Sequence, residues 1–515
     1  MATLGSKPRF LITAGLGFFA DGYLNLTIGL VVPILGYLYF QESEGSVPAV
    51  DSDIMKGGLS LGMVVGQIVF GVLGDAWGRH NIYGKELLIT IFSILLVILM
   101  PWKGMSPRDV TAWVAVWRVV TGSLSAEKAP LGSRAIRVLT VFSNIGLGNF
   151  SASIVFLVLL RAFKGAVASN LYCLQRVWRL HLGIGIIPAA LTLYSRLTIG
   201  ETAPYQRYVA TQDALEKRGL KKQWADFCDY FQEWKHAKVL FATSAAWFLF
   251  DIAYYGLNLN QSIILSRIGY TTGTTPWDML WKNHRGQSDR LGCGYIERVR
   301  QQFHSSAITC ILYVIWAGIS APIISTSTAG LMVMFAVSQF VICAGPKVTT
   351  FLIPAEVFPT RVRGTAHGLS AAAGKCGAIL TAFAFGTVEE AIGLSGVLGL
   401  FSGIMFLTAL VTLMIPETKG QSLAEIERDR MYDKSAVDSE LYRNKGTSPS
   451  NRGPGGTAHI QGLRSAYRLV LLSWERTTLL ASLLRIVLWI SRPFLPAGLN
   501  RTMRSAIGGR TTTSQ

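Results

Sequence analysis

An acidic residue, Asp251, lies in the middle of an almost uninterrupted apolar segment at residues 239–259. Trp247 and Tyr255 lie four residues before and after it. Each step of four residues overshoots a full helical turn by only about 40°, so the three side chains share one face. A carboxylate at the centre of a bilayer costs roughly 2.5–3.5 kcal/mol, and such residues normally face a water-filled cavity. This face therefore predicts a solute or proton site, in preference to a neutral aspartate bonded to a neighbouring helix.

The composition is that of a membrane protein. Hydrophobic residues make up 50% of the 515 positions, charged residues make up 15%, and the mean hydropathy is +0.38. A soluble domain would carry about 25% charged residues. Residues 10–40 are apolar, contain Asp21 and lack a small-residue cleavage site, so they predict a first span and not a removed signal peptide. We expect a multi-pass, all-α protein whose surroundings are the lipid bilayer.

The positions of the positive charges predict topology. The formal net charge is +18, but the basic clusters lie between apolar segments, so no nucleic-acid partner is expected. Basic residues precede the first span and fill the loop at residues 201–237, whereas the first connection carries acidic residues at 42–53. By the positive-inside rule, the N-terminus and the central loop are expected to be cytoplasmic.

Eleven spans are expected, in two halves. We assign residues 1–200 to an N-terminal half, 201–237 to the central loop, 238–427 to a C-terminal half and 428–515 to a cytoplasmic tail. The expected spans are 10–40, 56–76, 85–102, 110–124, 138–163, 180–199, 238–259, 307–326, 328–352, 365–388 and 393–415. A polar stretch, 266–306, separates the seventh from the next. In the tail, residues 464–495 predict an interfacial amphipathic helix, with a translated non-coding extension as the alternative.

A short motif recurs weakly in the two halves. Residues 71–79 read Gly-Val-Leu-Gly-Asp-Ala-Trp-Gly-Arg, and residues 289–292, followed by Arg298 and Arg300, echo this pattern. Such internal symmetry is typical of large transporter folds. Gly71 and Gly78 permit a tight turn, Asp75 can cap a helix N-terminus, and Arg79 can pair with a carboxylate of the same gate. An ordinary charged turn would not explain the echo.

Several motifs together resemble one transporter family. Residues 71–79 resemble the loop signature of the major facilitator superfamily, and residues 416–427 (Pro-Glu-Thr-Lys-Gly-Gln-Ser-Leu-Ala-Glu-Ile-Glu) resemble the closing motif of sugar porters and their phosphate-carrying relatives. Residues 356–375, 248–256 and 18–23 resemble the eleventh, seventh and first helices of fungal and plant phosphate:proton symporters. The resemblance covers about residues 8–430. It implies a helical bundle in two pseudosymmetric halves around a central phosphate site.

The resemblance also implies roles for individual residues. Asp21 matches the acid on the proton path, and Trp247, Asp251 and Tyr255 match residues at the phosphate. Lys375 matches the lysine that neutralises the anion. A lysine in an apolar helix needs an anionic partner, and either bound phosphate or Asp251 could serve.

Four departures from the family pattern affect the expected activity. Leu24 stands where a second acid is expected in the first helix, and Lys347 replaces the asparagine of a Gly-Pro-Asn motif. Lys347 either adds charge to the phosphate site or only occupies a helix break. In addition, an Asp-Tyr-Pro stretch is missing after Gly122 and an eighth span is missing near residues 278–300. We therefore expect the chain to transport poorly or not at all.

Three classes of function remain open. The first is phosphate:proton symport by alternating access across a membrane, which is expected to be the plasma membrane. The second is transport of a sugar or another organic anion, and the third is a transport-inactive or sensor variant. The sequence has no nucleophile–base pair, no phosphate loop and no zinc pattern among its six cysteines, so we expect neither an enzyme nor a metal or cofactor. The family topology places both termini in the cytoplasm, and the sequence leaves the oligomeric state open.

Overall fold

A computed structural model describes residues 6–43, 45–77, 85–100, 104–125, 135–197, 220–267, 298–320 and 328–417, and these residues are helical apart from short connections. Gly78, Arg79, the 289–292 echo and the predicted tail helix lie outside the described residues. The chain divides into two units, at residues 1–420 and 421–515. All of the structure described below belongs to the first unit.

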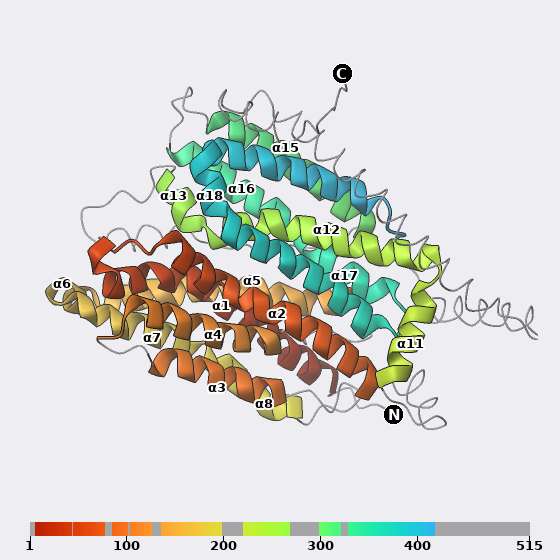
Figure 1. Ribbon diagram of the computed structural model, residues 1–515, viewed down its shortest axis with the longest axis horizontal. Helices are drawn as coiled ribbons and strands as arrows, with labels where there is room; N and C mark the ends of the chain where they lie inside the picture. The colour runs from red at the N-terminus through yellow and green to blue at the C-terminus, as the bar shows by residue number, and fades with distance from the viewer. Residues whose placement is uncertain are drawn as a thin grey trace, which may run out of the picture. The chain divides into compact units, whose positions relative to one another are not determined.

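The N-terminal half consists of long apolar helices joined by short connections (Figure 1). These are α1 (Ser6–Tyr39), α2 (Ala49–Trp77), α3 (Lys85–Leu99), α4 (Pro107–Ser125), α5 (Ala135–Ala162), α6 (Lys164–Ser169), α7 (Leu174–Ile184) and α8 (Ile186–Leu197). Within this half α1 packs on α5 and α8, and α2 packs on α4. The expected sixth span corresponds to α7 and α8, which meet at Gly185.

The C-terminal half contains two helices that are interrupted by glycine. After α11 (Leu220–Phe231), which belongs to the central loop, its members are α12 (Trp234–Leu259), α13 (Gln261–Arg267), α15 (Arg298–Ile319), α16 (Thr328–Ala344), α17 (Pro346–Val357) and α18 (Arg363–Thr412). Gly345 separates α16 from α17, and Pro346 begins α17, where its missing N–H costs no helical bond. Gly393 has φ 68° inside α18, a left-handed conformation that favours glycine, so this element corresponds to the two spans expected on either side of residue 393.

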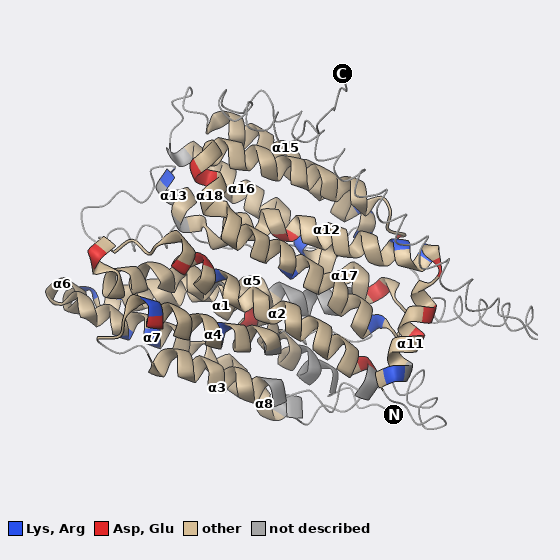
Figure 2. Cartoon of the chain, in the orientation of Figure 1, with Lys and Arg blue, Asp and Glu red and all other residues tan. Residues whose placement is uncertain are grey.

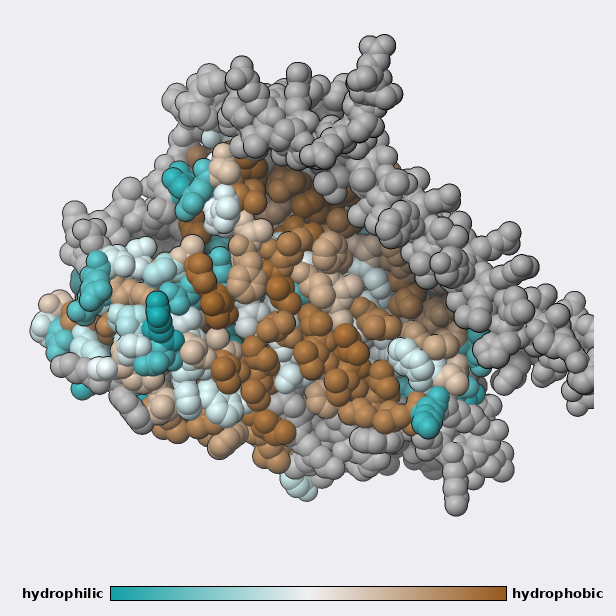
Figure 3. All heavy atoms as spheres, viewed as in Figure 1, coloured by the Kyte–Doolittle hydropathy of each residue, from teal (hydrophilic) through white to brown (hydrophobic). Residues whose placement is uncertain are grey.

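Among the described residues, eight helical stretches are long and apolar enough to cross a membrane. The all-α fold in two halves that the sequence predicted is therefore confirmed. Figure 2 shows that few charged residues interrupt the long helices, and Figure 3 shows a broad apolar surface over the same region. Exposed leucine, isoleucine, valine and phenylalanine side chains recur along α2, α3 and α15, as expected where helices face lipid.

Two predicted segments contain helix that the sequence analysis did not assign. Within the expected central loop, residues 220–231 form α11, because Phe227 and Phe231 can bury their rings against Phe358. The expected span at 307–326 begins earlier, since residues 298–306 of the expected polar stretch are already helical. Glu417 explains this early start, because its carboxylate accepts hydrogen bonds from the first backbone N–H groups of α15, at 3.1 and 3.0 Å.

The two halves contact each other most extensively along α2 and α18. A Cβ atom at Gly71 of α2 would lie 2.8 Å from the carbonyl oxygen of Gly364, and one at Gly368 of α18 would collide with the carbonyl of Gln67. Glycine at these two positions therefore lets the helix backbones approach closely. The Gly71 of the loop motif is thus explained by packing between the halves.

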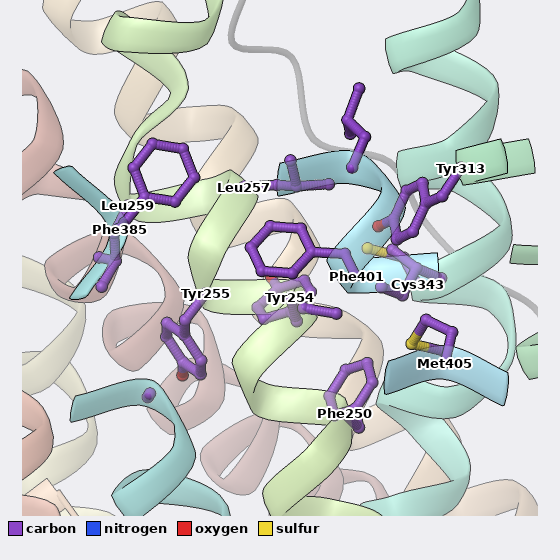
Figure 4. Packing of buried hydrophobic residues seen from close by; sticks show 14 of the residues in the cluster. Phe250, Tyr254, Tyr255, Leu257, Leu259, Tyr313, Cys343, Phe385, Phe401 and Met405 are labelled. Atoms are coloured by element: carbon purple, nitrogen blue, oxygen red, sulfur yellow. The ribbon is translucent and has the colours of Figure 1, made fainter. Parts of the chain in front are cut away.

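A cluster of aromatic and aliphatic side chains fills the C-terminal half (Figure 4). Phe250, Tyr254 and Leu257 of α12 pack among residues of α15, α16 and α18, including Tyr313 and Phe401. Tyr255 is the next residue after Tyr254 and its ring is nearly perpendicular to that of Tyr254, at an interplanar angle of 89°. Since residues adjacent on a helix point in different directions, α12 can present two hydroxyl groups to two different neighbours.

Candidate functional site

A cavity lies between the helices of the two halves. Its lining comes from α1, α2 and α5 on one side and from α12, α17 and α18 on the other. All six residues that the sequence assigned to substrate or proton binding line it: Asp21, Trp247, Asp251, Tyr255, Lys347 and Lys375. The further polar residues in the lining are Asn25, Gln67, Asn149, Tyr254 and His367.

A buried ion pair stands at the centre of this lining. The Lys375 ammonium on α18 donates to Asp251 Oδ2 on α12 at 2.7 Å and to the Tyr255 hydroxyl at 3.0 Å. The carboxylate of Asp251 is 2% exposed. The spacing of four residues that places Asp251 and Tyr255 on one face of α12 thus lets both contact the same ammonium. In this structure Lys375 takes Asp251 as its anionic partner.

The N-terminal half contributes to the same cluster through α1. Asn25 donates from Nδ2 to the Tyr255 hydroxyl at 3.2 Å, which joins α1 to α12. Asp21 lines the cavity one helical turn before Asn25 and is half-buried. A hydrogen-bonded path therefore connects Asn25 through Tyr255 to Lys375 and Asp251. Asp21 lies on the side of the cavity that the N-terminal half forms.

A second lysine approaches the cavity from the break between α16 and α17. Lys347 is the second residue of α17, and its ammonium donates to the Tyr254 hydroxyl at 2.5 Å and lies 4.5 Å from the centre of that ring. Tyr254 and Tyr255 are neighbours on α12, so two adjacent hydroxyl groups hold two lysines. The cavity consequently carries two ammonium groups, both from the C-terminal half.

Aromatic rings form the wall next to the ion pair. Trp247 lies edge-on to Phe351 and His367, with ring centroids 6.1 and 5.6 Å apart. A ring nitrogen of His367, Nε2, lies 3.3 Å from the carbonyl oxygen of Phe351. Gly374 allows Trp247 to lie directly against α18, since a Cβ there would collide with the indole.

Asp75 of the loop motif caps a helix of the other half. Its carboxylate accepts from the backbone N–H of Gly364 at 3.1 Å, and from the N–H and hydroxyl of Thr365 at 2.7 and 2.9 Å. These residues form the first turn of α18, where unpaired N–H groups and the helix dipole favour an anion. The motif therefore joins the two halves at this end of α2.

A second contact between the halves lies near the other end of α2. Lys56 is buried, and its ammonium donates to Asn260 Oδ1 at 3.1 Å, immediately after the C-terminal end of α12. Asp53 lies one turn before Lys56 on the same helix. Sequence reasoning missed this pair, as it missed Asn25 and Tyr254. For Asn25 a signal existed, because it follows Asp21 by four residues on one helix face.

Known proteins share this architecture. The family model described as sugar (and other) transporter matches residues 10–250 and 297–429. Among solved structures, the proton:xylose symporter XylE of the major facilitator superfamily gives a TM-score of 0.56 at 17% identity, with 82% of this chain and 99% of that chain covered. A double-tryptophan variant of XylE gives a TM-score of 0.59, covering 81% and 98%. These structures share the fold.

Sequence relatives carry more specific names. The chain is 34% identical to a Schizosaccharomyces pombe protein provisionally named inorganic phosphate transporter, over 82% of this chain and 88% of that protein. It is 31% identical to the repressible high-affinity phosphate permease of Neurospora crassa, over 86% and 90%, and 30% identical to the inorganic phosphate transporter PHO84 of Saccharomyces cerevisiae, over 88% and 89%. The chain therefore belongs to the sugar (and other) transporter family of the major facilitator superfamily, a family of multi-pass integral membrane transporters, within the group that includes these phosphate transporters.

Proposed function

We propose that this protein binds inorganic phosphate together with protons in the cavity between its halves, and that phosphate:proton symport by alternating access is its function. The observation that carries the proposal is the buried contact of Lys375 with Asp251 and Tyr255. A buried ion pair is costly to separate unless each charge finds a new partner. An arriving anion and an arriving proton supply those partners.

The proposed cycle uses the two charges in turn. Phosphate oxygens accept hydrogen bonds from the Lys375 ammonium, which weakens its contact with Asp251. The carboxylate of Asp251, now without its cation, takes up a proton, since a bare carboxylate buried at this depth is unfavourable. Asp21, on the other side of the cavity, is the second proton-binding group. Proton entry also lowers the repulsion between a carboxylate and the phosphate anion in one cavity.

The conformational step is a rocking of the two halves about this cavity, as in other transporters with related halves. The contact between Asp75 and α18 holds one end of the interface, and the contact between Lys56 and Asn260 holds the other. We place the N-terminus, the end of α2 that contains Asp75 and the C-terminus on the cytoplasmic side and the protein in the plasma membrane. The membrane potential then assists entry of net positive charge, at about 2.3 kcal/mol per charge per 100 mV.

The test uses the purified full-length chain. Radiolabelled phosphate binding is measured in detergent, and uptake is measured in liposomes with an inward proton gradient. Phosphate binding, with uptake that falls when a protonophore dissipates the gradient, supports the proposal. Binding of phosphate without uptake would indicate a transport-inactive binder. Uptake of xylose or glucose, with no phosphate binding, would overturn the phosphate assignment.

A further inference from the structure

The two cavity lysines differ in how much of their hydrogen-bonding capacity is already used. An ammonium group has three donors. Lys375 directs two of them to Asp251 and Tyr255, whereas Lys347 directs one to Tyr254 and otherwise has only a long contact, 3.9 Å, to the sulfur of Cys343. Among the described residues, therefore, Lys347 retains more donors for a ligand than Lys375 does.

The charge of Lys347 is also less compensated. Lys375 and Asp251 form a pair that is close to neutral as a unit. No described carboxylate lies within 4.0 Å of the Lys347 ammonium, whose partners are a phenol and an aromatic ring. The other titratable groups that line the cavity are Asp21 from α1, Tyr254 and Tyr255 from α12, and His367 from α18. Lys347 therefore has no carboxylate in direct contact, and the acid that interacts with its charge, Asp251, is already paired with Lys375.

The position of Lys347 in the helix strengthens this effect. Gly345 and Pro346 interrupt the backbone between α16 and α17, and Lys347 lies in the first turn of α17. The N-terminus of a helix carries a partial positive charge, and interrupted membrane helices use such ends to hold anionic groups. The side chain and the helix end therefore favour negative charge at the same place. Lys347 is half-buried and lines the cavity, so a ligand there can reach its ammonium.

We infer that Lys347 is a charge-selecting ligand, which makes the cavity prefer a doubly charged tetrahedral oxyanion over a singly charged one. Two ammonium groups, held by the adjacent residues Tyr254 and Tyr255, form a clamp: Lys375 contributes its remaining donor, and Lys347 contributes its free donors and a charge that no described carboxylate contacts. The preferred form of phosphate is then the dianion. This inference rests on the proposed function, because it assigns the charge of the ligand bound in the same cavity.

The experiment compares two anions of fixed charge. Sulfate is doubly charged and hypophosphite is singly charged at any neutral pH, so their affinities report charge preference without titration of the ligand. Both are measured by displacement of radiolabelled phosphate from the purified full-length chain, from Lys347→Gln and from Lys347→Arg. Glutamine keeps a donor for Tyr254 but removes the charge, while arginine keeps the charge. Elution of each variant as a monodisperse peak and an unchanged thermal transition serve as folding controls.

The expected result is a selective loss. Lys347→Gln should weaken sulfate binding by about 10- to 100-fold, the size of one charge-assisted hydrogen bond, and hypophosphite binding by less than about threefold. Lys347→Arg should keep the sulfate preference of the parent chain. Equal losses for both anions, or no loss for either, would overturn the inference while leaving phosphate binding by the parent intact. If Lys347→Gln does not fold, loss of the sulfate preference in Lys347→Arg would overturn it, and its retention would support it. A parent chain that binds none of the three anions would overturn both this inference and the proposed function.

Discussion

Removing the carboxylate of Asp75 should open the interface between the two halves at that end of α2. Asp75 is 3% exposed and accepts hydrogen bonds from Gly364 and Thr365 in the first turn of α18. Hydrogen bonds to a charged group contribute about 1.5–3 kcal/mol each, and a helix dipole adds about 0.3–1 kcal/mol. The three bonds share one carboxylate and are not additive, so we expect a net contribution of about 2–4 kcal/mol to the closed interface.

That energy corresponds to a population change of about 30- to 1,000-fold, at tenfold per 1.4 kcal/mol. Asp75→Ala should therefore move most molecules to a conformation with this end open. Thr365→Val is the graded control, because it removes only the hydroxyl donor and should shift the population by about 2- to 10-fold. One spin label is placed on α2 and one on α18 near this contact. Pulsed electron paramagnetic resonance in liposomes then measures the distribution of the distance between the two labels. It requires no transport activity.

The reasoning would be refuted if Asp75→Ala gave the distance distribution of the parent chain. It would also fail if Thr365→Val opened the interface as widely as Asp75→Ala, since the charge would then contribute nothing beyond the hydroxyl bond. A reduced thermal transition with an unchanged distance distribution would show that Asp75 stabilises the fold without controlling the conformation.

Three further predictions follow from the cavity and from the family comparison. Asp251→Asn should abolish proton-driven phosphate uptake while membrane insertion stays normal, and pH-dependent accumulation by this variant would contradict the proton role. Lys375→Gln should weaken phosphate binding by about tenfold or more, and Lys375→Arg by much less, because one charge-assisted hydrogen bond and the neutralising charge are lost only in the first; equal affinities in equilibrium binding would show that Lys375 is no anion ligand. The family match is interrupted between residues 250 and 297. The alignment with the Schizosaccharomyces pombe protein extends over 508 positions but includes only 82% of this 515-residue chain. The remaining positions of that alignment are gaps in this chain, so the relative has residues that this chain lacks. Restoring an Asp-Tyr-Pro stretch after Gly122 and an apolar span near residue 285 should therefore raise phosphate uptake in liposomes, whereas strong uptake by the unmodified chain would show that neither segment is needed.

Much of the fold could be predicted from the sequence, because apolar runs of about 20 residues and their breaks are local signals. The face of α12 was also predictable, since Asp251 and Tyr255 are four residues apart and the helix period fixes their common direction. The position of Lys375 opposite them came from resemblance, and the structure supplies the partner that the sequence had left open. The start of α15 was not predictable, because Glu417, which caps it, lies 119 residues from Arg298.

Sequence reasoning did not predict the partners in the contacts between the halves. Lys56 and Asn260 are 204 residues apart, and neither belongs to a motif. A lysine in an apolar helix signals that a partner must exist but does not name it. The loop motif identified Asp75 as a possible helix cap, yet only the folded chain shows that the capped helix, α18, belongs to the other half. Long-range pairs of this kind depend on how whole helices pack, which no local pattern encodes.

Both contacts involve α2, and this has a mechanical consequence for alternating access. Lys56 and Asp75 are separated by about 28 Å along the helix at 1.5 Å per residue, close to the thickness of the hydrocarbon core. One contact therefore lies near each side of the membrane, with the cavity between them. Between these contacts, Gly71 and Gly368 keep α2 and α18 in close contact. Both contacts are formed in this structure, and if α2 tilts about this close approach, one contact can separate while the other stays formed, because a helix of this length moves nearly as a rigid body. Breaking both contacts at once would lose both sets of bonds, and the cavity would open to both sides. A transporter of this design is consequently most stable with at least one contact formed, which is the condition that alternating access requires.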